Sequence, residues 1–164
     1  TRVGVNIPPE TMIELSKIKN IVADKEAIPN VSQLQEIKNG AEGDFSILCC
    51  DYPGYSLILP TLAMGGSGTA NVAGNVVPEE MAILSKPWET YEDVVKAREI
   101  YEELLPLLKL LYSVSNPVPV KAAVNLLGFK VGDPRPPLPI FSGDRLSEMT
   151  ELLRGSGYID KYSK

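Results

Sequence analysis

Residues 20–27 read Asn-Ile-Val-Ala-Asp-Lys-Glu-Ala, and this stretch decides how the rest of the chain is interpreted. Its short apolar run is followed at once by charged residues, which indicates a strand over 21–25 that ends at Lys25. Burial disfavours the charged form of an amine, and only an uncharged amine attacks a ketone to give a Schiff base. Lys25 is therefore a candidate nucleophile. The same pattern also fits a surface lysine that ends a strand.

The segments that follow predict alternating strands and helices. Strands are expected at 21–25, 45–50 and 69–73, with helices at 32–40 and 56–64 between them. This alternation implies parallel pairing with right-handed crossovers. The glycines at 65–68 lack the spacing of a nucleotide-binding fingerprint and indicate a tight turn, so no cofactor is expected.

The remaining segments are predicted to be mainly helical. Pro8 and Pro9 open the first helix, a capping box starting at Ser32 opens the second, and Gly128 closes a later one. The other helices are expected at 91–112, 119–127 and 144–153, with a packed proline-rich connector at 132–139 and a frayed tail at 155–164.

Composition excludes several classes of function. The 164 residues are 44% hydrophobic and 23% charged, as in an ordinary globular protein. A net charge of -5 without a basic cluster argues against a nucleic-acid partner. The longest apolar stretch, 104–114, is far shorter than the roughly 20 residues of a membrane span, so no membrane partner is expected.

The cysteines and the missing histidines limit the chemistry further. The chain has no histidine, which excludes histidine-based catalysis, and Cys49 and Cys50 lack the spacing of a metal site. Two adjacent cysteines in an apolar run suit reduced, packed thiols. This predicts a cytoplasmic location.

Further motifs stand in a fixed order around Lys25. Arg2-Val3-Gly4 precedes it, and Asn116-Pro117-Val118-Pro119-Val120-Lys121-Ala122-Ala123, Leu126-Leu127-Gly128 and Arg135-Pro136-Pro137-Leu138-Pro139 follow. Together with residues 20–27, these motifs make the chain resemble the pyruvate-dependent class I aldolases, the family of dihydrodipicolinate synthase and N-acetylneuraminate lyase. The resemblance runs from Arg2 to about Pro139.

The resemblance implies an α/β fold that is part of a (β/α)8 TIM barrel. Residues 1–115 would supply strands 6 to 8 with their helices, and residues 116–164 would form a C-terminal helical extension. A complete barrel usually needs about 250 residues, and Arg2 matches a position just after the fifth strand. The N-terminal barrel half is therefore expected on a second chain, in a segment absent from this sequence, or lost by cleavage. We do not expect the piece to fold alone, because open sheet edges would remain.

The resemblance also implies roles for individual residues. Lys25 falls on the lysine that forms the Schiff base with pyruvate. Arg2 matches the arginine that holds the carboxylate of the second substrate in the synthase branch, and Ala70 matches a position whose backbone carbonyl faces the substrate. The proton-carrying tyrosine would lie in the missing half. Tyr52 and Tyr55 are weaker candidates, because they follow a strand at the face where barrel active sites form.

Several positions depart from the family pattern. Val3 replaces a threonine, and Asp24 replaces an aliphatic residue. Strand alternation predicts that Asp24 points away from Lys25, into the layer between barrel and helices, where an unpaired carboxylate is costly. Asp24 should therefore have a buried partner or lie at the solvent-exposed end of the strand. Changes near Cys50 and in residues 69–75 predict a different backbone near the substrate.

These observations favour a lyase or synthase that condenses pyruvate with an aldehyde, which Arg2 suggests is aspartate semialdehyde in lysine biosynthesis. A sugar-acid aldolase that cleaves N-acetylneuraminate or a 2-keto-3-deoxy sugar acid is the alternative within the same chemistry. From another class, the chain fits a non-catalytic half barrel that serves as a scaffold. A homo-oligomer is expected because relatives are often dimers or tetramers.

Overall fold

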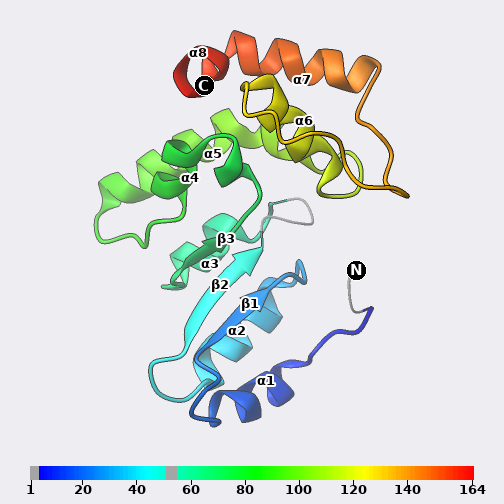
Figure 1. The fold of residues 1–164 in the computed structure, drawn as a ribbon. Coiled ribbons are helices and arrows are strands. Elements are labelled where there is room, and N and C mark those ends of the chain that lie inside the picture. Colours follow the sequence, from blue (N-terminus) through cyan, green and yellow to red (C-terminus); the bar gives the residue numbers. More distant parts are fainter. Residues whose placement is uncertain (1–3, 51–54) are drawn as a thin grey trace. The chain divides into compact units, whose positions relative to one another are not determined.

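The computed structural model describes residues 4–50 and 55–164 and divides the chain into two compact units. The first unit comprises residues 1–71 and 85–97, and the second comprises residues 72–84 and 98–164. Figure 1 follows the chain through both units.

The first unit is built on a parallel sheet of three strands in the order β1-β2-β3. The strands are β1 (Ala23–Glu26), β2 (Ser46–Cys50) and β3 (Gly68–Ala70). Helix α2 (Val31–Gly40) connects β1 to β2, helix α3 (Ile58–Ala63) connects β2 to β3, and α1 (Pro9–Ser16) precedes β1. The predicted parallel pairing and the strand-helix alternation are confirmed.

Two local predictions in this unit are wrong. The cap of α2 is Asn30, whose Oδ1 accepts hydrogen bonds from the backbone N–H groups of Ser32 and Gln33 at 3.0 and 3.2 Å. Asn30 has extended backbone angles, as an N-cap requires, so the helix begins before the predicted capping box at Ser32. Strand β3 is also shorter than predicted, because Ala73–Asn75 form the 3-10 turn η1.

The sheet of the first unit is covered on one face. Burial alternates along β1, with Asp24 and Glu26 buried and Ala23 and Lys25 exposed. Helix α2 lies behind β1 in Figure 1, and a hydrogen bond from Gln33 of α2 to Glu26 places the helix against this buried face. The core here includes the buried Leu34, Ile37, Ile47, Ile58 and Leu62.

The second unit is helical. It contains η1, α4 (Pro78–Leu84), residues 98–111 of α5 (Tyr91–Leu111), α6 (Val118–Leu126), α7 (Asp144–Gly155) and α8 (Tyr158–Tyr162). As predicted, Gly128 follows α6 with a φ of 88°, where a side chain would be strained. Its core is leucine-rich and includes Leu104, Leu107, Leu108, Leu111 and Leu153.

The C-terminal predictions need correction. Residues 155–164 are not a frayed tail, because α8 buries Tyr158 and the Oη of Tyr158 donates to Glu103 Oε1 at 2.8 Å. The connector at 132–139 was expected to be packed, yet six of its eight residues are exposed and only Pro134 and Leu138 are half-buried. Among the described residues, no helix combines the length and apolar character needed to cross a membrane.

Candidate active site

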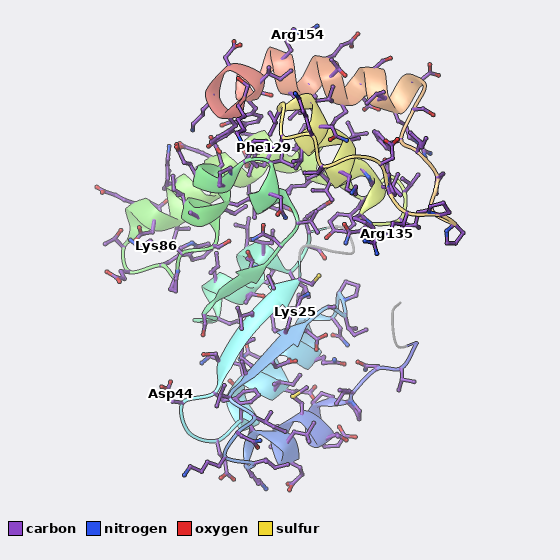
Figure 2. The ribbon with its side chains drawn as sticks, in the orientation of Figure 1. Lys25, Asp44, Lys86, Phe129, Arg135 and Arg154 are labelled. Atoms are coloured by element: carbon purple, nitrogen blue, oxygen red, sulfur yellow. The ribbon has the colours of Figure 1, made fainter. Side chains whose placement is uncertain are left out.

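Lys25 lies at one end of a row of paired residues that crosses the sheet. In the register of the strands, Lys25 of β1 pairs with Leu48 of β2, and Leu48 pairs with Gly68 of β3. Residues paired in this way share a face of the sheet. Lys25 is exposed, and Figure 2 labels it on β1.

The face that carries Lys25 is less buried than the opposite face at most of its described positions. Cys50 and Ala70 are also paired, and each stands two residues beyond a member of the Lys25 row, so they lie on the same face. Leu48, Cys50 and Ala70 are half-buried, whereas Ile47 and Cys49 on the opposite face are buried. Because helices form the outer ring of a barrel, the face opposite the helices is the one that lines its interior.

Glu26 is the last residue of β1, and its side chain lies on the helix-covered face. Its Oε1 accepts hydrogen bonds from the backbone N–H groups of Ala27 and Ile28, both at 2.7 Å. Its Oε2 accepts from Nε2 of Gln33 at 2.6 Å, and the Gln33 amide also exchanges two hydrogen bonds with Asn6, at 2.9 and 3.0 Å. This carboxylate is therefore fully satisfied, and it ties β1 to α2 directly beside Lys25.

Asp24 shares that buried face, but one of its two carboxylate oxygens lacks a partner among the described residues. It is 7% exposed, and its Oδ2 has no hydrogen-bond partner among the described residues. Burial, together with the neighbouring Glu26 carboxylate, raises the pKa of Asp24 to about 6. The prediction that Asp24 points away from Lys25 is confirmed by the burial pattern, but the expected buried partner is not found in the described chain.

The structure places only part of the predicted site. Lys25 and Ala70 lie on the same face of the sheet. Arg2 and Tyr52 fall outside the described residues. Tyr55 is described and is buried, at 2% exposure. The sequence did not predict the role of the Gln33 amide. Gln33 falls within the predicted capping box, and no nearby residue marks it as a hydrogen-bond partner of Glu26.

The second unit holds a pocket of about 340 Å³. Residues of the Asn-Pro motif form much of its wall, including Asn116, Pro117 and Lys121, together with Asn75 and several valines. Lys121 is held by a hydrogen bond of 2.9 Å from its Nζ to the carbonyl oxygen of Val131. The motif that contributed to the resemblance therefore lines a mostly apolar cavity with polar groups at a few points.

Comparison with known proteins assigns the family. Residues 1–155 match the model of the dihydrodipicolinate synthetase family. The chain therefore belongs to this family, as the resemblance implied.

Two curated relatives are both 4-hydroxy-tetrahydrodipicolinate synthases. The 4-hydroxy-tetrahydrodipicolinate synthase of Caldicellulosiruptor saccharolyticus is 43% identical over 142 residues, which cover 84% of this chain and 45% of the relative. That of Listeria monocytogenes is 40% identical over 151 residues, covering 92% and 50%. The chain spans about half the length of the curated relatives it matches.

Solved structures give the same result for the fold. The dihydrodipicolinate synthase of Cyanidioschyzon merolae with lysine bound has a TM-score of 0.85 at 30% identity, over 94% of this chain and 51% of that one. The dihydrodipicolinate synthase of Thermotoga maritima has a TM-score of 0.83 at 34% identity, over 94% and 52%. The three parallel strands and their helices thus match half of a synthase chain, and the predicted α/β class is confirmed.

Proposed function

We propose that this chain is the C-terminal half of a 4-hydroxy-tetrahydrodipicolinate synthase and that Lys25 forms a Schiff base with pyruvate. One structural observation supports this most: Lys25 lies on the sheet face opposite the helices, in the same row as Leu48 and on the same face as Ala70. Family membership and the identity to synthases from two organisms support the choice of activity.

The reaction needs an uncharged amine and a carbonyl carbon. In the proposal, Nζ of Lys25 attacks the keto carbon of pyruvate, and loss of water gives the imine. Loss of a methyl proton then converts the imine to an enamine, whose carbon forms the new bond to the aldehyde carbon of aspartate semialdehyde. Arg2 is proposed to bind the carboxylate of this second substrate. The carbonyl of Ala70 would face the bound substrate.

The proposal requires a second half of the barrel. Strands β1 and β3 are edge strands among the described residues, and exposed strand edges are templates for further pairing. In the proposal, residues 1–115 complete the barrel with an N-terminal half that also supplies the proton carrier, and residues 116–164 form the helical extension. Closing the barrel would enclose Lys25, and an enclosed site favours the uncharged form of an amine.

Borohydride trapping tests the covalent step. The complete barrel is incubated with pyruvate, reduced with sodium borohydride and digested for peptide mass spectrometry. We expect one reduced pyruvyl adduct, on the peptide that contains Lys25. The Lys25→Arg variant should give no adduct, whereas Lys19→Arg, which changes an exposed lysine of the same unit, should react like the unchanged protein.

A sugar-acid aldolase is the second candidate. Val3 in place of the family's threonine and the altered residues near Cys50 and in 69–75 are the sequence features that favour it. Product formation from aspartate semialdehyde compared with cleavage of N-acetylneuraminate or a 2-keto-3-deoxy sugar acid separates the two. If the complete barrel forms no adduct with pyruvate at all, the chain is instead a non-catalytic scaffold.

A further inference from the structure

The unmatched oxygen of Asp24 points to a contact with the other half of the barrel. Oδ2 of Asp24 is buried and has no hydrogen-bond partner in residues 4–50 and 55–164. Nearly all buried polar atoms in native proteins have a partner, and a buried carboxylate without one is particularly costly. A donor for this oxygen is therefore expected in the complete protein.

The described residues that pair with this part of β1 or contact its buried face through a hydrogen bond offer no spare donor. Across β2, the residue in register with Asp24 is Ile47, which has no side-chain donor. On the helix side, both hydrogens of the Gln33 amide are engaged, one with Asn6 and one with Glu26. Glu26, two residues along the same face, is itself an acceptor. The free edge of β1, which pairs with no described strand, leaves room for a donor from a further strand.

We propose that the strand that pairs with the free edge of β1 carries an arginine or lysine on its helix-facing side, in register with Asp24, and that this cation binds the Asp24 carboxylate. A cation fits better than a neutral donor because two carboxylates, Asp24 and Glu26, lie side by side on this buried face. The raised pKa of Asp24 in this chain agrees, since it reflects burial and the neighbouring negative charge without compensation. A cation would offset both charges.

The inference rests on the proposed completion of the barrel but not on the Schiff base at Lys25, because Asp24 and Lys25 occupy opposite faces of β1. The contact between Asp24 and the cation would help to select which strand pairs with the free edge of β1. A completing strand with an apolar residue at this point would leave the carboxylate buried and unpaired, whereas one with a cation would satisfy it.

Titration of Asp24 in the complete barrel tests the contact directly. The protein is labelled with aspartate carrying ¹³C at the side-chain carboxyl, and the Asp24 signal is assigned by its loss in Asp24→Asn. We expect a pKa below the ordinary aspartate value of about 3.9, because a bound cation favours the charged form. A pKa near 6 or above would overturn the inference.

Thermal unfolding of the same barrel gives a second measurement. Asp24→Leu should lower the melting temperature by several degrees, because it leaves the cation buried without its partner. Asp44→Leu, which replaces an exposed aspartate labelled in Figure 2, should change it by no more than about a degree. An unchanged or raised melting temperature for Asp24→Leu would show that no cation is present.

Borohydride trapping on the same sample separates this inference from the proposed function. An adduct at Lys25 combined with an Asp24 pKa near 6 would contradict the proposed cation contact and support the proposed Schiff-base chemistry. A low Asp24 pKa without any adduct at Lys25 would contradict the proposed synthase activity and support the proposed cation contact. If no polypeptide completes the sheet at β1, both proposals are wrong.

Discussion

Nε2 of Gln33 donates a hydrogen bond to Oε2 of Glu26 at 2.6 Å, and both residues are buried. The bond joins the end of β1 to the first turn of α2, one residue beyond the candidate nucleophile Lys25. It also links both elements to Asn6 in the segment before α1. Three segments that are separate in sequence are thus held together by one side-chain amide.

Replacement of this amide should be costly. Gln33→Leu keeps the size of the side chain but leaves Oε2 of Glu26 buried without its donor. We expect the free energy of unfolding to fall by about 1–3 kcal/mol, measured by urea denaturation of the complete barrel. Gln35→Leu is the matched control on the same helix, because Gln35 is exposed and its side-chain amide donates to Asn39 on the helix surface. Equal losses in the two variants would contradict a specific role for the Gln33 bond.

Gly66 lies so close to the backbone of Thr61 and Ile47 that a residue with a Cβ atom would clash there. It lies in the turn between α3 and β3, where a Cβ would stand 2.7 Å from the backbone oxygen of Thr61 and 3.2 Å from that of Ile47. The Thr61 methyl group would also be overlapped. Backbone atoms on two sides cannot yield without distorting the packing of α3 on β2.

Gly66→Ala should therefore lower the free energy of unfolding by about 1–3 kcal/mol, as expected for overpacking. Gly155→Ala is the control, and we expect no loss of stability from it, because a Cβ at Gly155 meets open space at the end of α7. That change should leave stability unchanged or raise it by up to about 1 kcal/mol. Calorimetric melting of both variants checks the pair, and a stable Gly66→Ala protein would refute the close approach.

Local sequence patterns were sufficient for the sheet and insufficient for the polar contacts. Apolar runs separated by helical segments correctly predicted the parallel pairing of β1, β2 and β3, because such runs depend only on nearby residues. Helix α8 was missed because its contacts reach Glu103 and Glu80, which are 55 and 82 positions away from their tyrosine partners. A five-residue segment carries too little local signal to reveal them.

The same distinction applies to the candidate site. Strand alternation was enough to separate Lys25 from Asp24, since neighbouring residues of a strand face opposite ways. It could not identify Gln33 as the donor to Glu26, because that bond depends on how α2 packs against β1. The placement of Arg2 stays a prediction, because residues 1–3 lie outside the described chain.

Tyr158 anchors α8 in the second unit. Its ring is 4% exposed, and its Oη donates to Oε1 of Glu103 on α5. We expect Tyr158→Ala to lower the free energy of unfolding of this unit by about 3 kcal/mol, because a buried aromatic ring and a hydrogen bond are both lost. Tyr158→Phe keeps the ring and should cost about 1 kcal/mol.

The companion change Lys161→Ala tests whether the ring or the charges hold α8. Lys161 forms ion pairs of 2.8 and 2.7 Å with Glu79 and Glu80, but its side chain is 42% exposed. Exposed ion pairs typically contribute less than about 1 kcal/mol. A larger loss for Lys161→Ala than for Tyr158→Ala, in urea denaturation, would mean that the ion pairs dominate.

Asp93 and Thr90 form a reciprocal cap at the start of α5. Oδ2 of Asp93 accepts hydrogen bonds from the backbone N–H groups of Glu89 and Thr90 and from the Thr90 hydroxyl, at 3.0, 2.8 and 2.9 Å. The Thr90 hydroxyl oxygen accepts in return from the backbone N–H of Asp93 at 3.2 Å. The Glu89 N–H, followed by the Thr90 donors, lowers the pKa of Asp93 to about 2.

This lowered pKa predicts a defined acid dependence of stability. The unfolded chain, with an aspartate pKa of 3.8, binds more protons than the folded chain at pH values between about 4 and 2. The contribution of the cap is therefore complete above pH 4 and is lost as the pH falls through 2. Asp93→Asn should reduce the melting temperature at pH 7 and flatten its fall between pH 4 and 2, whereas Asp133→Asn, in the exposed connector, should do neither. If the melting temperature of Asp93→Asn fell between pH 4 and 2 as steeply as that of the unchanged protein, the Asp93 carboxylate would not be the source of this acid dependence.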